Sequence, residues 1–214
     1  KALSSIREQA SNTTELGNAF ERLAKVFLEN DATQTQQYSE VWHYEDWAKE
    51  HEGYSTKDIG IDLVAKLRDE EGYCAIQCKL YEPEHSISKA DLDSFISASS
   101  TNDFTRLMLI DTSTQPIGKH AQSVFDKINQ EYIRVQLSEL EESRIDWSSY
   151  INDGTVRLHS KKELRDHQIK ALNAVRDGLA KDDRGKMIMA CGTGKTFTSL
   201  RIAEELAGAG KTVL

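Results

Sequence analysis

The chain has 214 residues, of which 38% are hydrophobic and 29% charged, as in an ordinary globular protein. Its 35 acidic and 27 basic side chains give a net charge of −8, which argues against a protein that coats nucleic acid unspecifically. No apolar run has the length of a membrane span, and charged residues interrupt the first thirty positions, so we expect neither a membrane segment nor a signal peptide. The three cysteines lack metal-site spacing, which favours reduced thiols in a cytoplasmic protein of bacterial type.

The charge is unevenly distributed along the chain. Residues 1–160 contain 16 basic and 28 acidic side chains, whereas residues 161–214 contain 11 and 7. A change of sign between two segments predicts two units with different roles, although solvated surfaces that differ by chance would give the same pattern.

Helix and strand patterns alternate in the first part of the chain. The run at 13–30 has an apolar face at helical spacing, with Thr13 or Thr14 as its cap, and Ser88 is the expected cap of a later helix. Two strand-like runs flank a turn that ends in Gly72, which is typical of a hairpin. In chain order we expect a helix at 13–30, a strand at 38–44, the hairpin strands at 59–66 and 73–80, a helix at 88–99, a strand at 107–111, a helix at 118–132 and a strand at 133–137. This succession predicts an α/β fold with a sheet flanked by helices.

A polar segment over 141–162 indicates a domain boundary. We therefore expect a first domain at 1–145, a linker at 146–162 and the start of a second domain at 163–214. The second part predicts a helix at 163–182, a strand at 186–191, a loop at 192–196, a helix at 195–207 and the beginning of a strand at 212–214.

The most specific local motif is a glycine-rich loop between the last predicted strand and helix. It consists of Gly192, Thr193, Gly194, Lys195 and Thr196. Glycines let successive backbone N–H groups point at phosphate oxygens, the lysine neutralises β- and γ-phosphate charge, and the threonine hydroxyl is suited to Mg²⁺. Met189 stands where the common form of this loop has glycine, and a strand-to-helix turn without a ligand is the alternative interpretation.

The sequence Leu-Arg-Asp-His-Gln at 164–168, upstream of Ala-Cys-Gly-Thr-Gly-Lys-Thr, resembles the Q-motif and motif I of superfamily 2 helicases. The resemblance is closest to the DNA translocases of restriction enzymes. It implies a RecA-like domain that binds ATP with Mg²⁺, in which Gln168, beside Arg165, contacts the adenine edge. Hydrolysis also needs an acidic residue on a second strand and an arginine, which this chain does not reach, so we expect it not to hydrolyse ATP alone.

A second constellation lies on the predicted hairpin. Asp62 is on the first strand, and Gln77 and Lys79 share a face of the second because they are two residues apart. Carboxylate and amide oxygens suit Mg²⁺, and a neighbouring ammonium can stabilise charge on phosphorus or hold the attacking water. These residue types indicate phosphodiester hydrolysis. A buried core amide and an edge lysine are the alternative interpretations of Gln77 and Lys79.

The segments Lys-Asp-Ile-Gly-Ile-Asp-Leu-Val-Ala at 57–65 and Ala-Ile-Gln-Cys-Lys at 75–79 resemble the Mrr-like branch of the PD-(D/E)XK nucleases, as does Gly-Asn-Ala-Phe-Glu at 17–21. The resemblance implies a mixed sheet flanked by helices, with Glu21, Asp62 and Gln77 as Mg²⁺ ligands and Lys79 as a fourth catalytic residue. Asp58 is an alternative to Asp62, and a degenerate nuclease that binds without cutting is an alternative overall. The six histidines show no pair spacing, so none is assigned to a metal.

Together, the two resemblances are similar to the N-terminal part of a single-polypeptide, type ISP restriction–modification enzyme. This implies an endonuclease that cuts double-stranded DNA in response to ATP-driven translocation, with methyltransferase and target-recognition domains further along the same polypeptide. A nuclease tethered to a motor needs little DNA affinity of its own, which would explain the acidic first part. The rivals are a helicase–nuclease that repairs DNA or restricts modified DNA, a nuclease fold that only binds DNA, and a switch that only binds nucleotide.

Overall fold

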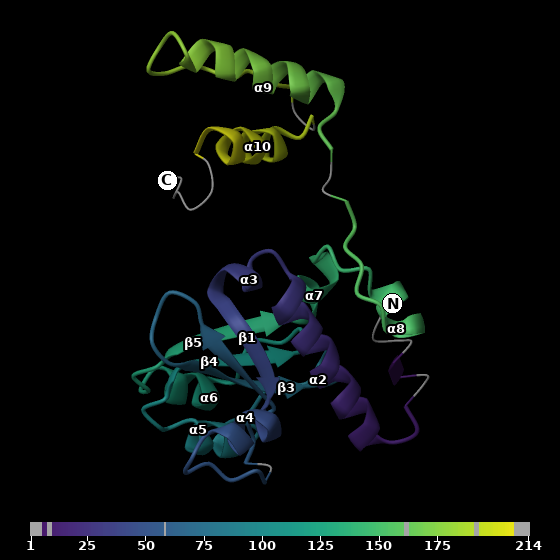
Figure 1. The fold of residues 1–214 in the computed structure, drawn as a ribbon, viewed down its shortest axis with the longest axis vertical. Coiled ribbons are helices and arrows are strands. Elements are labelled where there is room, and N and C mark those ends of the chain that lie inside the picture. Colours follow the sequence, from purple (N-terminus) through teal and green to yellow (C-terminus); the bar gives the residue numbers. More distant parts are fainter. Residues whose placement is uncertain (1–5, 8–9, 58, 161–162, 191–192, 208–214) are drawn as a thin grey trace. The chain divides into compact units, whose positions relative to one another are not determined.

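The structure is a computed structural model that describes residues 6–7, 10–57, 59–160, 163–190 and 193–207 (Figure 1). It divides into two compact units, residues 1–159 and residues 160–214. Within the described ranges, no helix is both long and apolar enough to cross a membrane.

The first unit is built on one mixed sheet of five strands in the order β1-β2-β3-β4-β5. Neighbours β1–β2 and β2–β3 are antiparallel, whereas β3–β4 and β4–β5 are parallel. The strands are β1 (Tyr38–His43), β2 (Leu63–Leu67), β3 (Tyr73–Lys79), β4 (Phe104–Asp111) and β5 (Glu131–Gln136). In this topology the ends of β1, β3, β4 and β5 and the start of β2 lie at one edge of the sheet.

Helices cover both faces of this sheet (Figure 1). On one face, α2 packs its apolar residues on alternate residues of β2 and β3, such as Leu63 and Ile76. On the other face, residues of α4, α5 and α6 pack on Val64, Ala75 and Leu109. The helices of this unit are α2 (Thr13–Asn30), α3 (Gln34–Gln37), α4 (Tyr44–Glu50), α5 (Asp93–Ala98), α6 (Lys119–Phe125), α7 (Leu137–Glu142) and α8 (Trp147–Asp153). The predicted α/β fold with helices on a mixed sheet is confirmed.

Helix α2 has the bounds that its apolar spacing predicts, but its cap differs. The side chain of Asn12 accepts a hydrogen bond from the Glu15 N–H at 2.8 Å, so the cap precedes both predicted threonines. The cap satisfies one of the N–H groups that have no partner within the first turn.

Three elements of the first unit are shorter, by three or more residues, than their sequence patterns predict, and in the second unit the helix predicted at 163–182 spans only Asp166–Leu179. The predicted cap Ser88 donates its N–H and hydroxyl to the Asp91 carboxylate, each at 2.8 Å, and this local turn delays α5 to residue 93. Helix α6 ends at Phe125 because residues from Glu131 onward pair with β4. Strand β2 begins at Leu63 rather than at residue 59, after a bend at Gly60 with φ +93°.

The polar segment after β5 contains two short helices, α7 and α8. In α8, Trp147 and Tyr150 pack against the core of the first unit, and the Trp147 Nε1 donates to the Leu140 carbonyl at 2.8 Å. The structure therefore divides the chain between residues 159 and 160, inside the segment 146–162 that the sequence indicates as a linker, and it places α8 in the first unit.

The described part of the second unit contains two helices, α9 (Asp166–Leu179) and α10 (Lys195–Ala207), which contact each other. Helix α10 has the predicted bounds. The predicted strand at 186–191 is not formed over residues 186–190, where Ile188 is 84% exposed. A strand needs a hydrogen-bonded neighbour, and the described part of this unit offers none. The strand predicted at 212–214 lies outside the described residues.

Candidate active site and nucleotide loop

One edge of the sheet collects the polar residues that the sequence singles out. Asp62 directly precedes β2, and Gln77 and Lys79 end β3, which runs antiparallel to it. The chain end of one antiparallel strand lies beside the beginning of its neighbour, so the backbones of these residues lie at the same end of the sheet. Glu21 and Asp62 line one cleft there, whereas Gln77 and Lys79 do not line it. The alternative ligand Asp58 lies outside the described residues.

Asp62 is bound to β3 by both its backbone and its side chain. Its N–H donates to the Ile76 carbonyl at 2.9 Å, and its Oδ2 accepts the Cys78 N–H at 2.6 Å. A hydrogen bond to a carboxylate is shorter and stronger than one between neutral groups. The side chain is therefore fixed against the backbone between Gln77 and Lys79.

Gln77 is 2% exposed, and only one end of its amide is satisfied within the described part of the chain. Its Nε2 donates to the Gly60 carbonyl at 3.0 Å, whereas its buried Oε1 has no donor there. A buried amide oxygen without a partner costs about 1–3 kcal/mol, so native proteins rarely keep one without a reason. The donor set of an amide oxygen and nearby carboxylates fits a hard divalent cation such as Mg²⁺.

Gly60 is a residue of this site that the sequence analysis did not single out. It adopts φ +93°, and a Cβ there would lie 2.7 Å from the Ser94 Oγ and 3.0 Å from the Phe95 N. Glycine alone fits this close approach to α5, and the resulting bend aims the Gly60 carbonyl at Gln77. In the sequence, the only indication of this bend is the glycine two positions before Asp62.

A cleft of about 470 Å³ joins Asp62 to Glu21 of α2. Residues that the sequence analysis did not name also line it. These are Asn18, Arg22, His43, Tyr44, Glu45, Asp46, Thr56 and Ile61. Burial and the cations Lys25 and Arg22 lower the pKa of His43, which favours its neutral form in this cleft.

The Cys78 thiol reports the electrostatic surroundings of the site. Burial raises its pKa well above the usual value, the anions Asp62 and Glu21 raise it further, and the Lys79 ammonium opposes them. Both carboxylates and the lysine therefore act on one point at the end of β3. Among the described residues, no group of three or more His, Cys, Asp or Glu side chains could hold a metal.

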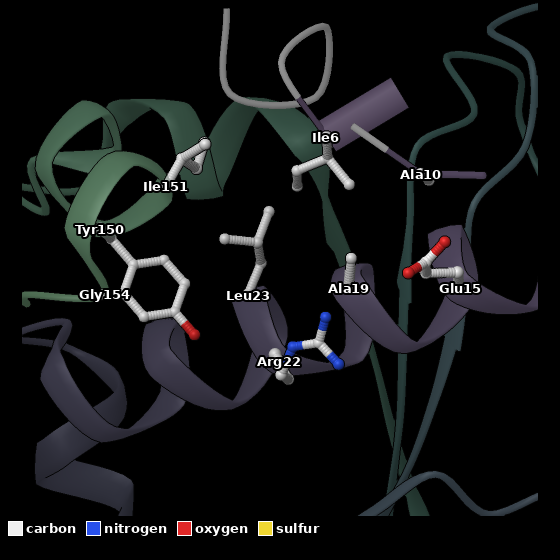
Figure 2. A pocket seen from close by; sticks show the side chains of 9 residues that line it. All are labelled: Ile6, Ala10, Glu15, Ala19, Arg22, Leu23, Tyr150, Ile151 and Gly154. Atoms are coloured by element: carbon white, nitrogen blue, oxygen red, sulfur yellow. The ribbon is translucent and has the colours of Figure 1, made fainter. Parts of the chain in front are cut away.

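A second cleft, of about 490 Å³, lies between α2 and α8 (Figure 2). Its wall is mixed: Leu23 and Ile151 face each other, and Glu15 and Arg22 also line it. None of the predicted catalytic residues lines it. Arg22 is the residue that this cleft shares with the cleft of Asp62 and Glu21.

In the second unit, the predicted phosphate loop leads into α10. Gly194 has φ +81°, the Thr193 hydroxyl donates to the Ala190 carbonyl at 2.7 Å, and Lys195 and Thr196 begin the helix. Gly192 lies outside the described residues. The backbone N–H groups at the start of this 13-residue helix carry partial positive charge, and a lysine lies beside them.

Gln168 has a structural role that the sequence analysis missed. It is 5% exposed, its Oε1 accepts the Arg165 N–H at 2.9 Å, and its Nε2 donates to the Thr193 carbonyl at 3.1 Å. A Cβ on Gly194 would lie 2.5 Å from that Nε2. The amide thus caps α9 and binds the loop at once, while Arg165 is exposed. Contact of Gln168 with adenine stays a prediction.

Comparisons with known proteins match both units. A family model described as restriction endonuclease matches residues 29–156, and one described as type III restriction enzyme, res subunit, matches residues 161–214. The first unit is accordingly a restriction endonuclease-like domain and the second a helicase fragment. No curated protein matches the chain.

Solved structures give two further likenesses. LlaBIII, an ATP-dependent type ISP restriction–modification enzyme bound to DNA, aligns with 97% of this chain at 30% identity and a TM-score of 0.76. The aligned part is 13% of that protein's chain. The MspJI restriction endonuclease in complex with a 27-mer oligonucleotide aligns with 64% of this chain and 29% of its own, at 17% identity and a TM-score of 0.40.

Proposed function

We propose that the first unit of this chain hydrolyses DNA phosphodiester bonds with Mg²⁺ bound at the edge of the sheet. The chain belongs to the restriction endonuclease family, which supports this activity. The observation that supports this most is the buried Oε1 of Gln77, which has no donor among the described residues, next to a carboxylate fixed on the same strand. The buried Oε1 of Gln34 also has no donor among the described residues, so the argument for Gln77 rests on its place beside Asp62 at the end of the sheet.

Glu21, Asp62 and Gln77 would hold the ion, with oxygen atoms from α2, from the residue before β2 and from β3. Bound there, Mg²⁺ would polarise the phosphoryl oxygen and lower the pKa of water. The hydrogen bond from the Cys78 N–H orients the Asp62 carboxylate before any ligand binds. This orientation avoids the entropic cost of ordering the side chain during the reaction.

Lys79 would stabilise the negative charge that develops on the phosphate oxygens. It shares a strand face with Gln77, and its side chain is half-buried. An oriented cation in such surroundings stabilises a transition state more than a ground state.

The second unit would bind ATP with Mg²⁺ through the loop at 193–196, and translocation of DNA would trigger cleavage by the first unit. The support is the match to a restriction-enzyme subunit and the likeness to an ATP-dependent enzyme bound to DNA. The nuclease and the motor would act together with methyltransferase and target-recognition domains of the same polypeptide. The acidic charge of residues 1–160 fits a nuclease that obtains DNA from its motor.

Substitution of the site in the natural protein tests the proposal. Asp62→Asn and, separately, Lys79→Ala should each lower cleavage of DNA in Mg²⁺ and ATP by about 100-fold or more, with ATP hydrolysis and translocation unchanged. Asp69→Asn, in the exposed turn at the other end of the hairpin, is the matched control. Cleavage that both site variants retain would refute the site, and a wild-type protein that binds but never cuts DNA would favour the DNA-binding rival.

A further inference from the structure

A buried carboxylate lies next to Lys79 on the sheet. Asp111 ends β4, is 0% exposed, and is the register partner of Lys79 across the parallel β3–β4 pair. Paired residues of neighbouring parallel strands lie about 4.8 Å apart and direct their side chains to the same face. The catalytic lysine proposed above therefore has an acidic neighbour in the interior.

Arg134 of β5 donates hydrogen bonds to both oxygens of this carboxylate. Its Nε donates to the Asp111 Oδ2 at 2.7 Å and its Nη2 to the Oδ1 at 2.9 Å, while the Ser113 N–H donates to the Oδ1 at 2.8 Å. The guanidinium also donates to the Gln115 carbonyl at 2.9 Å. This two-bond geometry is specific to arginine and leaves the carboxylate little capacity for another cation.

The ammonium of Lys79, by contrast, makes no hydrogen bond or ion pair with any residue that the structure describes. A buried carboxylate without a partner is unfavourable by several kcal/mol and attracts any cation within reach. If Arg134 did not neutralise Asp111, the neighbouring Lys79 would be the cation placed to do so.

We propose that Arg134 is a positioning residue for cleavage: by binding Asp111 it prevents this carboxylate from pairing with Lys79, and so keeps the lysine available for a DNA phosphate. The inference rests on the proposed nuclease function, because it concerns how Lys79 stays available for the substrate. Arg134 itself need not touch DNA, since its donors are directed at Asp111 and at the carbonyl of Gln115.

Three variants of the protein separate this role from a merely structural one. Arg134→Gln should lower the single-turnover cleavage rate at saturating DNA by about 30-fold or more, because Asp111 then binds Lys79. The double variant Asp111→Asn, Arg134→Gln removes both charges and should restore the rate to within about threefold of wild type. Arg134→Lys keeps a cation beside Asp111 but loses one of the two parallel hydrogen bonds. Its cleavage rate should therefore lie between the rates of Arg134→Gln and the double variant.

The structural readout does not depend on activity. Crystal structures of the Arg134→Gln variant should show the Lys79 Nζ within about 4 Å of an Asp111 oxygen, and those of the double variant should not. If Arg134→Gln does not fold, Arg134→Lys and the double variant still test the rates: Arg134→Lys should cleave more slowly than the double variant, and an equal or faster rate would overturn the inference.

Two outcomes would overturn the inference: a double variant as slow as Arg134→Gln, or an Arg134→Gln structure in which Lys79 stays away from Asp111. The failure of the nuclease function itself is distinguishable. In that case wild type and Asp62→Asn would both leave DNA intact, while the crystal structures would still test the competition between the two cations.

Discussion

The hydrogen bond between the Asp62 carboxylate and the Cys78 N–H predicts that two substitutions at one position act differently. Asp62→Asn keeps an oxygen that can accept the 2.6 Å bond, whereas Asp62→Ala leaves the N–H at the end of β3 without this acceptor. Both substitutions remove the negative charge. The pair therefore separates the structural role of the side chain from its role toward a metal.

The expected magnitudes follow from this geometry. A hydrogen bond to a charged group contributes about 1.5–3 kcal/mol, and one between neutral groups about 0.5–1.5 kcal/mol. Asp62→Ala should therefore lower the free energy of unfolding of the first unit by about 2 kcal/mol, and Asp62→Asn by about 1 kcal/mol. Affinity for Mg²⁺ or Mn²⁺ should fall by at least about 10-fold in both variants.

Urea unfolding followed by tryptophan fluorescence measures the stability, because Trp42, Trp47 and Trp147 all belong to the first unit. Calorimetry with Mn²⁺ measures the affinity on the same samples. The reasoning is refuted if Asp62→Asn binds Mn²⁺ as tightly as wild type. Equal stability of wild type and Asp62→Ala would also contradict it.

Three other predictions concern separate parts of the chain. Gly194→Ala should weaken nucleotide binding by at least about 10-fold in a fluorescent-nucleotide titration. The new Cβ would lie 2.5 Å from the Gln168 Nε2, and the backbone at this position has a φ of +81°, which alanine rarely adopts. The control is Gly178→Ala, at a helical position with nothing within 4 Å, which should bind nucleotide normally. Phe95→Ala, at a fully buried position, should lower the free energy of unfolding by about 3–5 kcal/mol in urea, and a loss below about 1 kcal/mol would contradict the packing of α5. Burial opposes ionisation of Asp91, but hydrogen bonds from its neighbours outweigh burial and lower its pKa. The carboxylate therefore stabilises the fold above about pH 4, and this contribution is lost as the pH falls through the lower pKa of the native state. Asp91→Asn should flatten the pH dependence of stability in that range, and an unchanged profile would refute the assignment.

The parts of the fold that the sequence predicts well are those in which one apolar face decides the structure. Helix α2 over Thr13–Asn30 and helix α10 over Lys195–Ala207 have the expected bounds. The hairpin is likewise formed, because alternating residues of β2 and β3 are buried on both faces and its turn ends in a glycine. These signals are local and need no knowledge of distant residues.

Elements that depend on competing local bonds or on distant partners could not be predicted from periodicity. The turn between Ser88 and Asp91 competes with helix formation, and the pairing of Glu131 with Arg106 determines where the last strand begins. The apolar run at 186–190 has strand character but no described neighbour to pair with.

The candidate site shows the same division. The spacing of Gln77 and Lys79 places them on one strand face, and the resemblance to known nucleases brought Glu21 into the set. Neither could show that Asp62 binds the Cys78 N–H, or that Gln168 is buried against the phosphate loop. Such contacts join residues far apart in the chain, and no local pattern encodes them.

A crystal of the chain soaked in MnCl₂, with the ion located by its anomalous scattering, tests the central claim most directly. The account predicts one strong peak bonded to carboxylate oxygens of Glu21 and Asp62 and to the Gln77 Oε1, at oxygen–metal distances of about 2.0–2.3 Å. A Gln77 oxygen that stays in the interior while Mn²⁺ binds elsewhere, or no bound ion at millimolar concentration, would contradict it.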